Sequence, residues 1–477
     1  MSDQTLGSFD DPFTTAPATV VAPALNPTAV ELVDEVPEVA APVPMPTITL
    51  DPEQEAAVIT CCDLTKRIVC VSGEGGSGKT TIMRLAYEKL VAGGYSVMLL
   101  APTGKAAKRV TEATGLPAMT IHRGLEYSHP GDRDEKTGKV LGVSVPKRDH
   151  NMPLNADVVI VDEFSMVNHE VGRNLFDAIK RGAVVRAFGD MNQLQPIEDT
   201  PEAKEGSPFA KLLKKFDGIV LKTNHRQLAG SGIATNCHLI LSGKSPVRRD
   251  DFEIKFTEKP IDVLTDYVMN KLDQGVNFGH IQHQIITPMR KFWVGTHALN
   301  GVVQGLLSDT SGPSMRLPRH KWDKNEVWIR VGDKVICEQN IYNLHSLMPN
   351  DPLYLAPTNQ LMNGESGVVT HLHDDESIEI NLGDRSVTVP PFIELETKDG
   401  RQTIFDPRRE LSLGYVITTH KAQGSEYDHV VYVLNKSSSY AQSRSNFYTA
   451  MSRTRKQAYL ITDQRSFSLS VWKVEKR

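Results

Sequence analysis

Short apolar runs recur along the chain and are separated by stretches with helical character. They lie at residues 68–71, 96–100, 158–161, 184–188 and 219–221. Runs of this length that are apolar throughout are typical of strands in a parallel sheet that helices cover on both faces. The pattern therefore predicts an α/β fold. Polar residues that follow these strands are candidates for a ligand site, because open α/β sheets bind ligands at the carboxyl ends of their strands.

The first apolar run leads directly into a glycine-rich sequence. Residues 73–80 read Gly-Glu-Gly-Gly-Ser-Gly-Lys-Thr, and a helix is expected at residues 81–91. This is the P-loop pattern in its strand–loop–helix context, and it predicts a site for a nucleoside triphosphate. Backbone N–H groups would face the phosphates, Lys79 would meet the β- and γ-phosphate oxygens, and Thr80 would bind Mg²⁺. The predicted nucleotide-binding residues here are Gly73, Gly75, Gly76, Ser77, Gly78, Lys79, Thr80 and Thr81.

Two further apolar runs end in residues that suit the same chemistry. The run at 158–161 is followed by Asp162 and Glu163. Asp162 can join the Mg²⁺ shell, while Glu163 can orient and deprotonate the attacking water. The run at 184–188 leads into residues 189–196, in which Gln193 is the predicted γ-phosphate sensor. Adjacent acids or a polar turn on a surface are usually only solvated, but a position directly after a buried strand favours the catalytic interpretation.

Gln54 precedes the P-loop and has two possible roles. A helix is predicted to begin near residue 52, with Asp51 as its N-cap and Gln54 at the capping-box position. The amide could instead recognise the adenine edge, since it donates and accepts a hydrogen bond at once. The sequence leaves both roles open.

Charge is distributed unevenly along the 477 residues. The net charge is −5, yet residues 1–65 contain 11 acids and no lysine or arginine. The remaining residues carry 53 basic against 47 acidic side chains, a net of +6. A mildly basic body permits a phosphate-backbone partner without requiring one. Residues 1–46 hold eight of the 28 prolines and predict a disordered acidic tail, which could be a solvated leader, compete with DNA, or dock a replication or single-strand-binding protein.

Other features exclude whole classes of protein. No apolar run is long enough to cross a bilayer, and the N-terminus lacks a basic start and an apolar signal stretch, so a cytoplasmic location is expected. The five cysteines show neither a C-x-x-C pair nor a metal-binding spacing. Inert buried thiols are therefore favoured over a redox or zinc role.

Taken in order, these motifs resemble those of superfamily one helicases of the RecD-like branch, including its Dda-like phage members. The resemblance covers residues 50–462. Beyond Gln54, the P-loop, residues 162–166 and residues 189–196, it rests on Ala-Pro-Thr-Gly-Lys-Ala-Ala at 101–107, Thr-Ile-His-Arg at 120–123, Asn-His-Arg-Gln at 224–227, Thr-His-Lys-Ala-Gln-Gly-Ser-Glu at 419–426 and Tyr-Thr-Ala-Met-Ser-Arg at 448–453. One departure is Ser452, where many relatives have threonine.

The resemblance implies a monomeric DNA helicase that uses ATP and Mg²⁺, moves 5′-to-3′ along single-stranded DNA and separates duplex or forked DNA. Such enzymes act in replication, recombination and repair, here in a bacterial or phage-infected cytoplasm. Arg226 and Arg453 are implied to be arginine fingers from a second domain. Gly424 and Glu426 are implied to border the nucleotide. The alternatives are an RNA helicase or nucleoprotein remodeller and, less favoured, a small-molecule kinase.

The resemblance also implies a set of strand contacts. Taken alone, these residues would be turn or structural residues, but the ordered set favours contact with a nucleic-acid backbone of any sequence. They are Pro102, Thr103, His122, Thr287, Pro288, Thr296, Asn300, Thr419, His420 and Lys421.

Two RecA-like parallel-sheet domains with two insertions are the implied architecture. The first domain would span 47–215, with a β-hairpin, or pin, inserted at 123–154. The second would combine 216–326 and 410–477. Short strands expected at 327–336, 367–371, 377–382 and 402–405 predict a small SH3-like barrel inserted at 327–409. Trp322, Trp328 and Tyr354 are expected in its core rather than stacked on bases.

Overall fold

The computed structural model describes residues 50–127, 145–198, 200–225, 230–276, 278, 282–307, 311–318, 326–342, 344–345, 359–396 and 402–474. The chain divides between Pro52 and Glu53, and the description below concerns Glu53 onward. The predicted acidic tail, most of the predicted pin, Arg226, Trp322 and Tyr354 lie outside the described residues. Within the described ranges, no helix combines the length and apolarity needed to cross a membrane.

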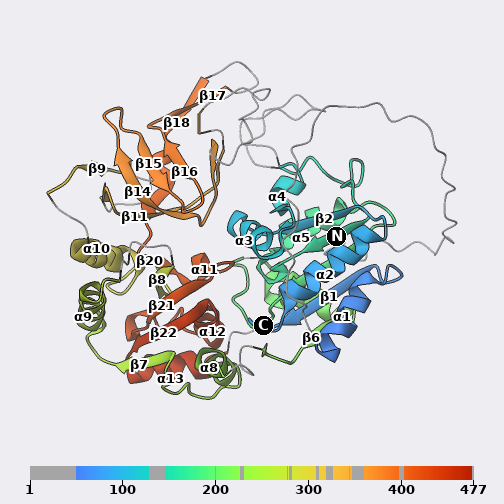
Figure 1. Cartoon of the computed structure of the whole chain (residues 1–477), viewed down its shortest axis with the longest axis horizontal. Helices are drawn as coiled ribbons and strands as arrows, with labels where there is room; N and C mark the ends of the chain where they lie inside the picture. The colour runs from blue at the N-terminus through green and yellow to red at the C-terminus, as the bar shows by residue number, and fades with distance from the viewer. Residues whose placement is uncertain are drawn as a thin grey trace, which may run out of the picture. The chain divides into compact units, whose positions relative to one another are not determined.

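A six-stranded parallel sheet forms the first RecA-like domain (Figure 1). Its order is β3-β2-β4-β5-β1-β6. Strands β1, β4 and β5 are buried along their whole length, which explains why their sequences are continuous apolar runs. The strands are β1 (Ile68–Gly73), β2 (Val97–Ala101), β3 (Ala118–Thr120), β4 (Val158–Val161), β5 (Val184–Gly189) and β6 (Ile219–Leu221).

Helices connect these strands, and most of them begin at a side-chain cap. Thr103 caps α3 by accepting from Ala106 N–H, and Ser207 caps α6 in the same way from Ala210 N–H. Helix α2 differs, because its N-cap is Gly78 and no side chain caps it. The helices are α1 (Pro52–Cys62), α2 (Lys79–Ala92), α3 (Gly104–Thr114), α4 (Ile121–Gly124), α5 (His169–Asp177) and α6 (Pro208–Lys215), with 3₁₀ turns η1 (Phe164–Met166) and η2 (Glu202–Glu205).

A second parallel sheet forms the second RecA-like domain. Its order is β20-β8-β21-β22-β7, so strands from two distant parts of the chain share one sheet. The strands are β7 (Phe252–Phe256), β8 (His283–Thr287), β20 (Val416–Thr418), β21 (Tyr427–Val433) and β22 (Thr454–Thr462). The helices are α8 (Gly232–Leu241), α9 (Pro260–Asp273), α10 (Thr296–Leu307), α11 (Thr419–Ala422), α12 (Arg444–Ser452) and α13 (Gln464–Trp472), with the 3₁₀ turn η5 (Lys436–Ser438).

An antiparallel sheet, which we call the inserted sheet, lies between β8 and β20 in the chain. Its order is β16-β15-β14-β11-β19, an arrangement compatible with the predicted barrel. The strands are β11 (Lys334–Cys337), β14 (Ser366–Leu372), β15 (Ile378–Asn381), β16 (Ser386–Val389) and β19 (Leu411–Leu413). Strand pairs β9 (Ser314–Arg316) with β10 (Trp328–Arg330), β12 (Ile341–Tyr342) with β13 (Gln360–Leu361), and β17 (Ile393–Glu396) with β18 (Gln402–Phe405) accompany it, with the 3₁₀ turn η4 (Pro407–Glu410).

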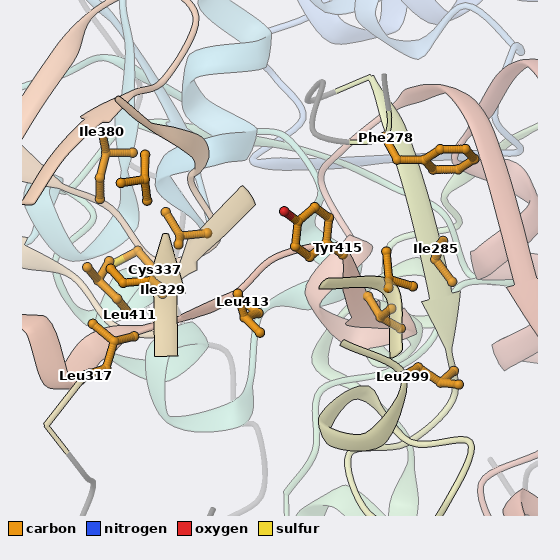
Figure 2. Packing of buried hydrophobic residues seen from close by; sticks show 14 of the residues in the cluster. Phe278, Ile285, Leu299, Leu317, Ile329, Cys337, Ile380, Leu411, Leu413 and Tyr415 are labelled. Carbon is orange, nitrogen blue, oxygen red and sulfur yellow. The ribbon is translucent and has the colours of Figure 1, made fainter. Parts of the chain in front are cut away.

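Two expectations for this region are wrong. The strand expected at 327–336 is two strands, β10 and β11, because the chain turns at Gly332 with a φ of 90° that favours glycine. The side chain of Trp328 is 44% exposed and does not belong to the core. The core itself is shared with the second RecA-like domain, since Ile380 and Leu411 of the inserted sheet belong to the same buried cluster as Ile285 (Figure 2).

Arg186 is an unusual residue in the first domain, because it is fully buried in the middle of β5. Its guanidinium donates to the carbonyl oxygens of Cys61 (2.6 Å), Asp63 (2.8 Å) and Lys66 (3.0 Å). These carbonyls lie at and just beyond the end of α1, where the helix carries partial negative charge. Arg186 therefore holds α1 against the sheet, and Gln54 lies on that helix.

We expect Arg186→Met to lower the free energy of unfolding by about 3 kcal/mol, because several buried carbonyls lose a charged donor. In a domain of this size, that loss corresponds to a fall in Tm of roughly 6–12 °C. Thermal denaturation followed by circular dichroism measures it. Arg181→Met, at an exposed neighbouring arginine, is the control. Equal Tm values for the two variants would contradict the role assigned to Arg186.

Candidate functional site

The loop between β1 and α2 forms a cradle of backbone groups. Gly76 and Gly78 have φ angles of 93° and 87°, which other residues rarely adopt. The ammonium of Lys79 lies within the loop and donates to the carbonyl oxygens of Gly73 (2.6 Å) and Glu74 (3.1 Å). The hydroxyl of Ser77 is buried and has no hydrogen-bond partner among the described atoms. A phosphate group fits this cradle, because its oxygens would accept hydrogen bonds from the loop. They would also replace the two carbonyl oxygens as the partners of Lys79.

The two acids after β4 lie beside this loop and are both buried. Burial and the neighbouring Glu163 carboxylate raise the pKa of Asp162 to about 6, while Arg109 and Lys79 oppose the shift. Within the described residues, no group of three His, Cys, Asp or Glu side chains could hold a metal ion. A magnesium ion here would therefore depend on Asp162, Thr80 and phosphate oxygens, which are ligands that this hard cation accepts.

Glu163 lies between two arginines from different domains. Its Oε1 is 3.7 Å from Arg109 Nη1, on α3 of the first domain, and 4.0 Å from Arg453 Nη1, directly after α12 of the second. Its Oε2 is buried and has no hydrogen-bond partner in the described part of the chain. A positioned carboxylate oxygen of this kind can accept a proton from an attacking water.

Arg453 is buried and only loosely held. One guanidinium nitrogen donates to Ser425 O at 3.4 Å and another to Ser452 Oγ at 3.3 Å, while Nε has no partner among the described atoms. These weak contacts leave the charge available for a phosphate. The second predicted arginine finger, Arg226, lies outside the described residues, so only Arg453 can be placed at the site.

Gln193 is connected to the second domain through Asp190 and Tyr448. Its Nε2 donates to Asp190 Oδ2 at 3.4 Å, and the Tyr448 hydroxyl donates to the same oxygen at 2.6 Å. The Tyr448 hydroxyl also accepts from Gly75 N–H in the P-loop at 3.4 Å. Tyr448 and Asp190 are both fully buried, and burial raises the pKa of the Tyr448 hydroxyl well above its usual value. The Gln193 Oε1 atom has no partner among the described atoms, so it remains available to a bound group.

The residues before Arg226 also hold the P-loop. Asn224 donates from its side chain to Gly75 O, and the backbone N–H of His225 donates to Gly76 O, both at 3.1 Å. Gln54 Nε2 donates to Ser77 O at 3.1 Å and lies 2.8 Å from His225 Nε2. Neither role predicted for Gln54 included this contact with the loop, and recognition of adenine stays a prediction.

One predicted strand-contact residue, Thr103, lies beside Gly424, which is implied to border the nucleotide. Gly424 has a φ of 69°, and a Cβ added there would lie 3.4 Å from Thr103 Oγ1. Lys421 points into the inserted sheet, where its ammonium donates to Asn363 Oδ1 at 2.7 Å and lies 3.1 Å from the Glu338 carboxylate. His122 packs on Tyr127, and burial lowers its pKa. Of the predicted set, Pro102, Thr103, His122, His420 and Lys421 are at least partly exposed.

Five other predicted strand contacts have buried side chains. Thr287 donates to Val294 O at 2.8 Å, and Asn300 makes two hydrogen bonds to the backbone of Val416. Thr287 and Asn300 thus stabilise their own domain, and contact between these five residues and a strand stays a prediction. The five residues are Thr287, Pro288, Thr296, Asn300 and Thr419.

Sequence reasoning missed Arg109 and gave no role to Tyr448 or Asp190. Arg109 donates to Glu426 Oε1 at 2.8 Å, and that partner is 317 residues away in the sequence. Nothing in the local pattern pairs two such distant residues. Tyr448 and Asp190 lay inside two of the recognised motifs, so their position in the motif was the only available signal.

A P-loop sheet joined to a second parallel sheet that contributes a buried arginine defines a core of two RecA-like domains. A family model described as an AAA domain matches residues 49–255, and one described as a UvrD-like helicase C-terminal domain matches residues 413–461.

The chain is also similar to curated helicases. It is 30% identical over 389 residues to the ATP-dependent RecD2 DNA helicase of Deinococcus radiodurans, covering 82% of this chain and 46% of that protein. It is 26% identical over 446 residues to the RecBCD enzyme subunit RecD of Mycolicibacterium smegmatis, covering 84% of this chain and 69% of that subunit. The chain thus spans about half the length of the first relative. The predicted resemblance to the RecD-like branch of superfamily one helicases is confirmed.

Solved structures of Pif1 helicases share the fold. The Bacteroides Pif1 helicase in complex with ADP-AlF3 and ssDNA matches with a TM-score of 0.54 at 20% identity, covering 90% of this chain and 95% of that one. The Pif1 helicase from Candida albicans matches with a TM-score of 0.51 at 19% identity, covering 90% and 97%. The predicted fold class of two RecA-like parallel-sheet domains is thereby confirmed.

Tyr448→Phe removes the hydroxyl that joins the two domains at Asp190. We expect it to lower the free energy of unfolding by about 1–3 kcal/mol, because the buried carboxylate loses a donor. Denaturant unfolding of Tyr448→Phe, Asp190→Asn and the double variant should give a coupling above about 0.5 kcal/mol. Tyr432→Phe is the control, since that hydroxyl donates to Asn446 within the second domain. No coupling between positions 448 and 190 would contradict this role.

Proposed function

We propose that this chain is an ATP- and Mg²⁺-dependent translocase that moves along single-stranded DNA and unwinds duplex DNA. The observation that carries this proposal is the approach of Arg453, from the second domain, to Glu163 beside the P-loop of the first. Catalytic groups supplied by two domains make hydrolysis depend on how those domains close on each other. The DNA helicases among the relatives support the choice of substrate.

The proposed roles at the nucleotide follow from the contacts around the loop. Bound Mg²⁺ would offset charge on the phosphates, with Thr80 and Asp162 as its protein ligands. Lys79 would leave the carbonyls of Gly73 and Glu74 for phosphate oxygens. Glu163 would accept the proton of the attacking water through Oε2, and Gln193 would orient that water or the γ-phosphate.

Arg453 would supply the charge that stabilises the transferring phosphoryl group. Its guanidinium is buried and its partners are weak, so moving it toward a phosphate costs little hydrogen bonding. Gly424 and Glu426 border the same region and lie one short loop after α11. Arg226 stays a predicted second finger.

The proposed strand path runs over the partly exposed members of the predicted contact set. Thr103 is partly exposed and packs against Gly424, a buried residue of the second domain, so a strand bound at Thr103 would lie next to a contact between the two domains. Hydroxyls, backbone amides and lysine bind the phosphate backbone without reading its sequence. The 5′-to-3′ direction, the domain boundaries, the monomeric state and the cytoplasmic location stay predictions.

Lys79→Ala and Arg453→Ala should each abolish ATP hydrolysis. For Arg453→Ala, the rate of hydrolysis should fall by at least about 10³-fold. Arg453→Ala should keep the affinity for a fluorescent ATP analogue, whereas Lys79→Ala should weaken it, because only Lys79 lies in the phosphate cradle. A phosphate-release assay and an analogue titration measure the two effects. Lys89→Ala and Arg455→Ala, at exposed neighbouring positions, are the controls. Normal hydrolysis by either site variant would refute its assignment.

Unwinding assays on partial duplexes with a 5′ or a 3′ single-stranded tail test the proposed activity. We expect unwinding of the 5′-tailed DNA only, and stimulation of hydrolysis by single-stranded DNA rather than RNA. Activity on the 3′-tailed substrate alone would overturn the direction. Stimulation by RNA alone would favour the RNA helicase alternative, and hydrolysis insensitive to any nucleic acid would favour a small-molecule kinase.

A further inference from the structure

Arg109 connects the candidate catalytic carboxylate to the second domain. Its Nη2 donates to Glu426 Oε1 at 2.8 Å, while its Nη1 lies 3.7 Å from Glu163 Oε1. Glu163 follows β4 of the first domain, and Glu426 lies just before β21 of the second. Two carboxylates from different domains therefore share one guanidinium, which a planar group with donors on both sides permits.

Arg109 contacts Glu426 more closely than it contacts Glu163. The contact with Glu426 is a direct hydrogen bond, whereas the contact with Glu163 is longer than one. The side chain of Glu163 is 8% exposed, so solvent screens its charge poorly and a displacement of the guanidinium changes its surroundings. Movement of Glu426 would thus be transmitted to Glu163 through Arg109.

Arg109 also lies on the helix that begins in the proposed strand path. Thr103 caps α3, and Arg109 follows six residues later, at a rise of roughly 9 Å along the helix. Gly424, two residues before Glu426, packs against the same helix end, since a Cβ added to it would lie 3.3 Å from Ala106 Cβ. A strand bound at the partly exposed Thr103 would therefore act on the contact between α3 and the turn that carries Glu426.

We propose that Arg109 is a positioning residue that couples strand binding to hydrolysis. Without a strand, Arg109 shares its charge between Glu426 and Glu163 and, together with Arg453, surrounds Glu163 Oε1. When a strand shifts Gly424 relative to α3, Arg109 moves with Glu426, and Glu163 is freed to align with the attacking water. This inference rests on the proposed function, because it presumes hydrolysis that a nucleic-acid strand stimulates.

The role predicts an effect on the ratio of stimulated to unstimulated hydrolysis rather than on hydrolysis alone. Arg109→Gln keeps a long polar side chain but removes the positive charge and the guanidinium donors that face both carboxylates. We expect the ratio of ATPase rates with and without single-stranded DNA to fall about tenfold. Arg109→Lys keeps the positive charge but lacks the planar guanidinium. It should therefore give a ratio between those of Arg109→Gln and the wild-type protein.

Glu426→Gln removes the other end of the connection and should also lower the ratio. The double variant Arg109→Gln with Glu426→Gln should be no worse than the more affected single variant, because both changes break one pathway. Additive losses would indicate two independent structural effects. Glu112→Gln, on the same helix with a side chain that is 64% exposed, is the matched control and should keep the wild-type ratio.

The experiment separates failure of the inference from failure of the proposed function. All variants are assayed as the whole 477-residue chain with a single-stranded oligodeoxynucleotide, and thermal melting confirms that they fold. A wild-type protein whose hydrolysis ignores every nucleic acid would overturn the proposed function. The role of Arg109 would be overturned, and the proposed function kept, by a different result. In that result DNA stimulates the wild-type protein, but the ratio of ATPase rates with and without DNA in Arg109→Gln rises or stays within threefold of the wild-type value.

Discussion

A buried carboxylate needs positive charge nearby, and Glu163 obtains it from both domains. Arg109 approaches from α3 of the first domain and Arg453 from the end of α12 of the second, at 3.7 and 4.0 Å from the same oxygen. Charges removed from water are costly unless they are compensated, so these side chains constrain each other's position. The separations are longer than direct hydrogen bonds and leave Oε2 without a partner in the described part of the chain. Neither domain alone completes this site.

The second domain also contacts the loops that would surround the nucleotide. Leu194, next to Gln193, donates its backbone N–H to Thr449 Oγ1 at 2.9 Å and accepts from Gln423 Nε2 at 2.8 Å. Tyr448 meets both Asp190 and the P-loop. A shift of α12 would therefore displace Gln193 and the P-loop together, which is what an ATPase coupled to domain movement requires.

The inserted sheet contacts the same helix that carries Arg109. Lys108 Nζ lies 2.7 Å from Asp384 Oδ2, and a Cβ added to Gly104 would lie 2.8 Å from Met362 Cβ. Lys421, just before the Gly424 turn, donates to Asn363. Helix α3 of the first domain thus contacts both the second domain and the inserted sheet. A movement of either one would therefore displace this helix.

The amino-acid sequence by itself determined the local features. The β1 strand, the P-loop, and the acids after β4 were predicted because a buried parallel strand and a phosphate-binding turn each impose a pattern on consecutive residues. The break at Gly332 was missed although a glycine that turns the chain is a local signal, and the exposure of Trp328 was missed because it depends on how the strands pack. Only the tertiary structure decided that Arg109 meets Glu426 and that Tyr448 meets Asp190. Those partners are 317 and 258 residues apart, and folding alone brings their charges and hydroxyls within hydrogen-bond distance.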